Sequence, residues 1–170
     1  MELKPEQAVF MRDMILPNME REQQSTLRVL EAVPADKADY KPDANSMSAL
    51  DLSWHIASAE NLFLSAIING AFDFTPRDKA KTMAETIAFY KETCAKNVAA
   101  IKTMTGDQLA KVVDFRGMMQ MPAVSFMPFN VNHIVHHRGQ LSVYLRPMGG
   151  KVPAIYGESY DSKAAKAAKG

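Results

Sequence analysis

The sequence contains a single cysteine, Cys94, and this scarcity excludes two kinds of site. One thiol cannot form an internal disulfide, and it cannot build a cysteine-based zinc site. Cys94 falls on the apolar stripe of a predicted helix, where burial raises the pKa of a thiol. We therefore interpret Cys94 as a packing residue, so that any thiol used in chemistry would come from a bound cofactor.

The sequence also lacks an excess of positive charge and any long apolar run. Its 170 residues include 20 Lys and Arg against 19 Asp and Glu, which gives no broad basic surface for the phosphate backbone of nucleic acid. No run approaches the roughly 18 apolar residues of a membrane span, and the first residues show no signal-peptide pattern. We expect a cytoplasmic protein that binds neither nucleic acid nor membranes.

Glycine is absent from the first 69 residues, and glycine-free segments favour helix. Apolar side chains recur every three or four residues in four segments, which predicts four helices. These segments are Pro5–Val33, Ser48–Gly70, Thr82–Met104 and Pro122–Arg146. Pro17 predicts a kink in the first helix or a break into two helices. The expected fold class is all-α, a four-helix bundle with a kinked first helix.

The rest of the chain shows little periodicity. Val112 and Val113 give only a weak indication of a strand, and residues 151–161 look extended. The Lys/Ala-rich residues 161–170 have the composition of a flexible tail. We therefore expect a single bundle domain over residues 1–160, followed by a tail over residues 161–170.

Aspartate and glutamate are absent from residues 115–157, a stretch that carries three of the four histidines. His133 and His137 are four residues apart, a spacing that places two imidazoles on one helix face, as a divalent metal requires. His55 lies on the inward stripe of the second helix, where a buried imidazole needs a partner. The three together predict a metal site. The alternative is that the helical pair is coincidental and that His55 is a hydrogen-bonded core residue.

Other polar residues beside this triad suggest supporting roles. Asn132 and Gln140 could orient imidazoles through hydrogen bonds. His136 points about 100° away from His137 on a helix, so it is better placed to support a ligand or to face a partner than to bind the ion itself.

Four further side chains each have two interpretations. Arg138 and Arg146 could bind an anionic substrate in a pocket free of carboxylates, or they could be surface or dimer residues. Tyr144 could place a hydroxyl near the metal as a catalytic group, or it could be a core aromatic. Glu60 could act as a general base, but it lies off the His55 stripe, which favours a solvated or interface position.

Three stretches resemble the DinB-like metal-binding four-helix bundles, and the resemblance covers nearly the whole chain. They are Ser46–Ile56, which contains Trp54-His55-Ile56, then His133–Arg146, which contains His-His-Arg-Gly-Gln, and Val152–Gly157. The resemblance implies that His55, His133 and His137 are the metal triad. It also implies a Zn²⁺ or Ni²⁺ cofactor, an unusual helix order, a homodimer and, in several members, the use of a low-molecular-weight thiol.

Three neutral ligands leave a metal its full charge and one open tetrahedral position, the form expected of catalytic zinc. Such an ion lowers the pKa of bound water to about 7 and deprotonates a coordinated thiol. We therefore expect a metal-dependent enzyme that activates a thiol, as an S-transferase does, or water, as a hydrolase does. Its substrate would be a small anionic molecule or a thiol. The alternative is a non-catalytic, stress-related dimeric bundle that binds a metal or senses an effector.

Overall fold

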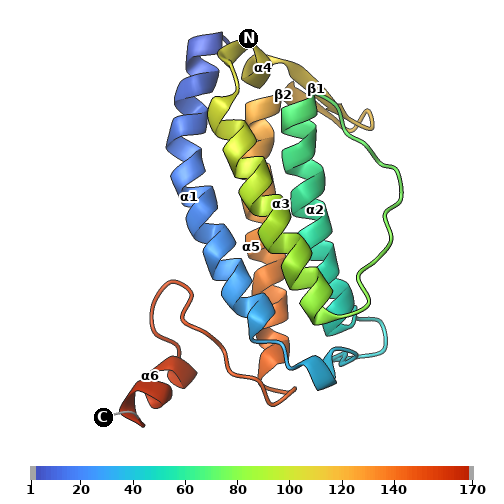
Figure 1. The fold of residues 1–170 in the computed structure, drawn as a ribbon, viewed down its shortest axis with the longest axis vertical. Helices are drawn as coiled ribbons and strands as arrows, with labels where there is room; N and C mark the ends of the chain where they lie inside the picture. Colours follow the sequence, from blue (N-terminus) through green and yellow to red (C-terminus); the bar gives the residue numbers. More distant parts are fainter. Residues whose placement is uncertain (1–2, 169–170) are drawn as a thin grey trace.

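The computed structural model describes residues 3–168 and consists of helices apart from one short β-hairpin (Figure 1). Four long helices form the bundle: α1 (Pro5–Glu31), α2 (Ala49–Asn69), α3 (Met83–Thr103) and α5 (Phe126–Leu145). The shorter elements are η1 (Ala35–Lys37), α4 (Gly106–Ala110), β1 (Val112–Phe115), β2 (Met119–Pro122), η2 (Ala123–Ser125) and α6 (Tyr160–Ala167). The predicted all-α bundle is confirmed.

The helices are not arranged around the bundle in sequence order. Helix α1 packs against α3 and α5, and α2 packs against the same two helices. The order around the bundle is therefore α1, α3, α2, α5, with α5 behind α3 in the view of Figure 1. The α2–α5 seam and the α1–α3 seam therefore lie on opposite sides of the bundle.

Capping residues fix where α2 and α3 begin and end. The Ser48 hydroxyl accepts a hydrogen bond from the Asp51 backbone N–H, and Thr82 does the same for Glu85. Gly70 ends α2 with a left-handed φ of 67°, a conformation that glycine adopts without steric cost. The predicted bounds of both helices are confirmed to within a residue.

The structure differs from some local expectations. Helix α1 runs through Pro17 as one element, so of the two alternatives at Pro17, a kink or a break, the break into two consecutive helices is wrong. Helix α5 begins at Phe126 and not at Pro122, because residues 119–122 pair with residues 112–115 in an antiparallel hairpin. Residues 160–167 form α6, within the expected flexible tail over residues 161–170, of which residues 169–170 lie outside the described part of the chain. No helix within residues 3–168 is long and apolar enough to cross a membrane.

A belt of buried polar side chains divides the apolar core into two clusters. One cluster contains Leu64 and Ile67 of α2, and the other contains Leu52 and Ile56 of the same helix. Glu60 lies between them along α2 and is only 2% exposed, so the solvated interpretation of this residue is wrong. The belt also includes Gln23, Thr26, Asn61, Asn97, Asn130 and Arg138.

Candidate metal centre

Packing of α2 against α5 brings the three predicted histidines together. His55 comes from α2, and His133 and His137 come from successive turns of α5. The four-residue spacing stacks the two α5 imidazoles on the face that meets α2. All three side chains are partly buried.

The nitrogen atoms of the three rings converge. The Nε2 atom of His55 lies 3.2 Å from Nε2 of His133 and 3.1 Å from Nε2 of His137. One nitrogen from each ring lies within 4.8 Å of the others. A tetrahedral zinc ion with bonds of 2.0–2.1 Å has ligand atoms about 3.4 Å apart. The spacing of the nitrogens is therefore close to that of a metal-ligand set.

Gln140 selects the tautomer of one ring. Its Oε1 atom lies 3.1 Å from Nδ1 of His137, and an amide oxygen can only accept, so this Nδ1 carries the proton. The lone pair of His137 is then on Nε2 and faces the other rings. Several lone pairs directed at one point repel each other unless a cation or a proton lies between them. The predicted orienting role of Gln140 thus has its geometry in the structure.

Protonation of His55 or His133 is unfavourable in this arrangement. Burial, together with the nearby His137, lowers the pKa of His55. Burial, followed by the neighbouring imidazoles of His137, His55 and His136, lowers the pKa of His133 to about 4. Both rings are neutral at pH 7, which is the form that ligates metals.

Asn132 and His136 lie outside the convergent group. Asn132 is exposed, and no hydrogen bond joins it to a histidine within residues 3–168. His136 is also exposed, and its ring contacts the His137 ring edge-on at 4.7 Å. The buried Nδ1 atom of His133 has no protein partner in the described part of the chain. The orienting role suggested for Asn132 is therefore not seen.

Tyr144 is a buried residue that reaches the histidines only through Gln140. Its hydroxyl accepts a 3.4 Å hydrogen bond from Gln140 Nε2, and its ring packs edge-on against Tyr40. The ring therefore has the core position that was one of the two interpretations, and the hydroxyl is bonded to the residue that orients His137.

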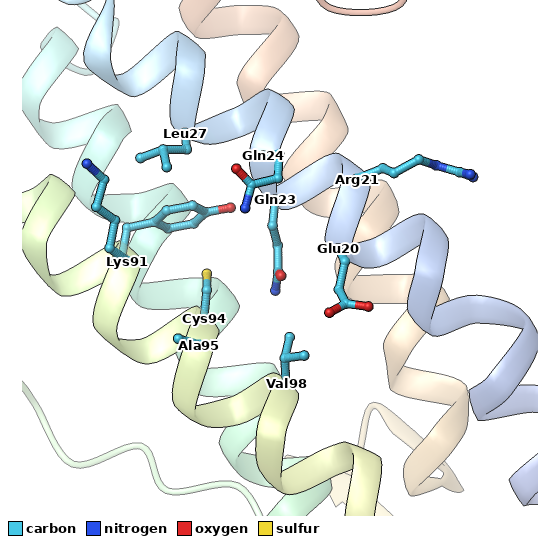
Figure 2. Close-up of a pocket in the computed structure, with 10 residues that line it drawn as sticks. Glu20, Arg21, Gln23, Gln24, Leu27, Lys91, Cys94, Ala95 and Val98 are labelled. Atoms are coloured by element: carbon cyan, nitrogen blue, oxygen red, sulfur yellow. The ribbon is translucent and has the colours of Figure 1, made fainter.

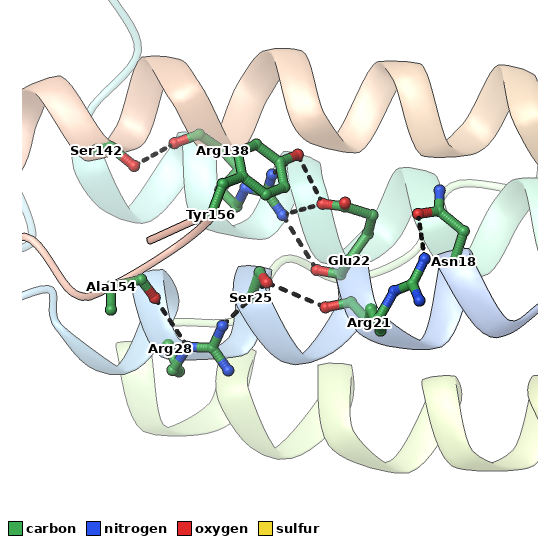
Figure 3. Close-up of polar contacts among 9 residues, drawn as sticks. All are labelled: Asn18, Arg21, Glu22, Ser25, Arg28, Arg138, Ser142, Ala154 and Tyr156. Carbon is green, nitrogen blue, oxygen red and sulfur yellow. Dashed lines mark hydrogen bonds and ion pairs between the residues drawn. The ribbon is translucent and has the colours of Figure 1, made fainter. Parts of the chain in front are cut away.

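Arg138 points toward Glu22 on α1 (Figure 3). Only 2% exposed, it donates to Glu22 Oε2 at 2.6 Å and to the Tyr156 hydroxyl at 2.5 Å. The Tyr156 hydroxyl in turn donates to Glu22 at 2.9 Å. The surface interpretation of Arg138 is therefore wrong, and its guanidinium is engaged with Glu22 and Tyr156. Arg146 is exposed and pairs with Asp161.

A cavity of about 290 Å³ adjoins His55. One wall is the outer face of α2, with Trp54, Ser58 and Leu62, and the other is the segment between α2 and α3. That segment was missed in the sequence because it has no periodicity. Its residues on the cavity are Asp73, Phe74, Thr75 and Arg77. The cavity therefore contains a carboxylate on this side, contrary to the expectation of a pocket free of carboxylates. Asp73 supplies it from outside the stretch 115–157, which has no Asp or Glu.

Comparison with known proteins places these features in a family context. The DinB family model matches residues 10–168. The uncharacterized protein YrdA of Bacillus subtilis is 30% identical over 159 residues, which cover 89% of this chain and 92% of YrdA. The crystal structure of the DinB-like protein YjoA from Bacillus subtilis is 26% identical with a TM-score of 0.71, and covers 85% of this chain and 99% of YjoA. A DinB-like protein from Bacillus cereus, 23% identical, has the same fold with a TM-score of 0.71, over 92% of this chain and 100% of its own.

Proposed function

Since the chain belongs to the DinB family, we propose that its histidine triad makes it a divalent-metal-dependent enzyme acting on a small substrate. The observation that carries the proposal is the convergence of three imidazole nitrogens from α2 and α5 beside a cavity. Imidazole donors suit Zn²⁺ and Ni²⁺ among the available divalent ions.

Each residue of the site has a defined task in this proposal. His55, His133 and His137 hold the ion, and Gln140 keeps His137 in the ligating tautomer. A bound divalent ion with an open position would lower the pKa of a water or a small thiol and so supply a nucleophile at neutral pH.

The adjoining cavity supports a substrate of limited size with an apolar part. Trp54, Leu62 and Phe74 supply apolar surface, and Arg77 and Ser58 supply hydrogen-bond donors. Arg116 stacks on the Phe74 ring at 3.8 Å and thereby connects the β-hairpin to this wall. We propose that these residues position the electrophilic substrate while the histidine site presents the nucleophile.

Metal binding is tested on untagged protein, because a histidine tag would itself bind the ion. Elemental analysis and calorimetric titration with Zn²⁺ and Ni²⁺ should give about one ion per chain. The variant in which His55, His133 and His137 are all alanine should lose it. His136→Ala is the matched control, because this exposed imidazole lies beside the triad without joining it. Equal binding by the triple variant would refute the proposal.

The proposed activity has two versions, which differ in whether a thiol or water is the nucleophile, and one set of assays distinguishes them. The thiol branch predicts conjugation of a test electrophile that requires both metal and an added low-molecular-weight thiol. The water branch predicts metal-dependent ester or amide hydrolysis without thiol. Turnover that survives complete removal of the metal by a chelator would exclude both branches.

A non-catalytic role is the second candidate, and one observation favours it. The ligands come from two different helices, α2 and α5, so a bound ion would join them and stabilise the bundle. In this case the ion would have no open position for an added ligand. The absorption spectrum of a Co²⁺-substituted site would then not change when azide or a thiol is added. The homodimer proposed for either role is tested by light scattering with and without metal.

A further inference from the structure

A groove of about 330 Å³ lies between α2 and α3, and we call it the α2–α3 groove. Ile68 of α2 and Phe89 of α3 give it an apolar part. Arg77, from the segment between the two helices, lines both this groove and the cavity beside His55, whereas the other lining residues of the two differ. The groove is therefore a second hollow with its own set of side chains, next to the proposed substrate cavity.

Two buried amides form the floor of the α2–α3 groove. Asn61 and Asn97 line it and are 6% and 4% exposed. Asn97 Nδ2 donates to Asn61 Oδ1 at 3.1 Å. The other two amide atoms, Asn61 Nδ2 and Asn97 Oδ1, make no hydrogen bond with residues 3–168, yet neither is sealed from solvent. Exchanging oxygen and nitrogen in both amides again leaves one donor and one acceptor free, so the floor offers one of each to an occupant.

Three charged side chains line the same groove without forming ion pairs. Arg77, Glu92 and Lys96 are all exposed. Within residues 3–168, none of them pairs with an opposite charge. Two cations and one carboxylate are thus available beside the two amides.

The groove between α1 and α3, shown in Figure 2, has about the same volume but lacks this combination. Its buried amide is already engaged, because Gln23 Nε2 donates to Glu60 at 2.7 Å. The charged residues on its rim also have partners: Lys91 pairs with Glu31, Glu20 pairs with Lys102, and Arg21 donates to Asn18. Free amide atoms and unpaired charges therefore occur together in the α2–α3 groove and not in the α1–α3 groove.

The free groups of the α2–α3 groove form a donor set and an acceptor set. Arg77, Lys96 and the Asn61 amide donate, and the first two carry positive charge. Glu92 and the Asn97 carbonyl accept, and the first carries negative charge. A ligand that matches both sets needs a carboxylate, which only accepts, and an ammonium group, which has three donors.

We propose that the α2–α3 groove binds a free α-amino acid with an apolar side chain. The carboxylate of the ligand accepts from Arg77, Lys96 and Asn61, and its ammonium group donates to Glu92 and Asn97. Its side chain lies in the apolar part of the groove. A simple carboxylic acid would leave the acceptor set without a partner, and a simple amine would leave both cations unpaired.

The test uses the full chain and L-leucine as the probe, followed by amide NMR shifts. We expect saturable shifts in α2, in α3 and at residue 77. The matched probes are 4-methylpentanoate, which lacks the ammonium group, and 3-methylbutylammonium, which lacks the carboxylate. Each should bind at least about tenfold more weakly, since a hydrogen-bonded charged group contributes about 1.5 to 3 kcal/mol. Equal affinity for all three probes would overturn the proposal in favour of a merely apolar groove.

Amino acids also coordinate metal ions, so the groove must be separated from the histidine site. His133→Ala should bind leucine as the wild type does, because this residue does not line the groove. Loss of leucine binding in this variant would assign the ligand to the metal and overturn the proposal. Since the groove needs no metal, its failure and that of the proposed enzyme are independent results.

Two pairs of variants on the exposed side of α3 test the groove without disturbing the core. Lys96→Met should weaken leucine by about threefold or more, whereas Lys91→Met, which changes a lysine of the α1–α3 groove, should not. Ala100→Phe fills the α2–α3 groove and should abolish binding, whereas Ala99→Phe, outside both grooves, should not. Absence of saturation with leucine, or equal affinity within either pair, would overturn the proposal.

Discussion

Replacing Glu60 by glutamine should remove most of one pH-dependent contribution to stability. Burial raises the pKa of Glu60 from 4.5 to about 7, a direction that the hydrogen bond from Gln23 opposes. The folded state therefore binds the proton more tightly than the unfolded state does. This contribution is fully present below pH 4.5 and is lost as pH rises through 7. Because one pKa unit corresponds to about 1.4 kcal/mol, the whole shift is worth about 3 kcal/mol.

Most of this contribution, about 2 to 3 kcal/mol, disappears between pH 5 and pH 8. Glutamine keeps the shape and cannot ionise, so the unfolding free energy of Glu60→Gln relative to wild type should rise by that amount across the interval. In a chain of this size it corresponds to a change of roughly 5 to 10 °C in the difference between the two Tm values.

Urea unfolding at several pH values, with a chelator present, measures this difference. The chelator removes any contribution of metal binding. Glu92→Gln, which removes an exposed carboxylate from α3, is the control and should follow the wild-type profile. A stability difference between Glu60→Gln and wild type that does not change with pH would refute the reasoning.

Three further variants test individual contacts. His133→Ala should weaken zinc binding by roughly a hundredfold or more, measured in competition with a chelating dye, because loss of a ligand costs more affinity than loss of a residue that only orients one. Gln140→Leu should weaken zinc roughly 10- to 100-fold, because His137 loses the acceptor for its Nδ1 proton, whereas the exposed Asn132→Ala should leave the affinity unchanged. Arg138→Ala should lower the unfolding free energy by about 3 kcal/mol in chemical denaturation, since it leaves Glu22 buried without its cation; a loss below 1 kcal/mol would contradict this.

Short-range sequence signals were sufficient to predict the bounds of α2 and α3 and the shared helix face of His133 and His137. Ser48, Thr82 and Gly70 act through hydrogen bonds or a φ angle within a few residues, so the sequence predicts their roles directly. The spacing of His133 and His137 likewise determines a shared helix face whatever the rest of the fold is. That His55 meets them depends on α2 packing against α5; the inward stripe of the second helix suggested this contact, and the family resemblance implied it.

Long-range pairing explains what the sequence did not show. Arg138 follows His137 directly, yet one step along a helix turns a side chain by about 100°, so Arg138 points to α1 and finds Glu22, which is 116 residues away in the chain. Glu60 looked solvated because its buried partner Gln23 belongs to another helix. The cavity wall at Phe74 comes from a segment without regular structure, whose course no periodic pattern specifies.

Stability measurements alone do not distinguish a metal-dependent enzyme from a non-catalytic bundle in which the ion only joins α2 to α5. Any ligand that binds only the folded chain stabilises it, by about 2.7 kcal/mol when its free concentration is a hundred times Kd. A catalytic ion held by His55, His133 and His137 would therefore raise Tm as a structural one would. The two roles differ in access, because catalysis requires an open ligand position reached from the cavity beside His55. Filling that cavity with Ser58→Trp should leave zinc affinity within a few-fold of wild type while it abolishes the response of a Co²⁺-substituted site to azide. If azide bound equally well in this variant, the cavity would not be the route to the metal, and the proposed substrate position would be wrong.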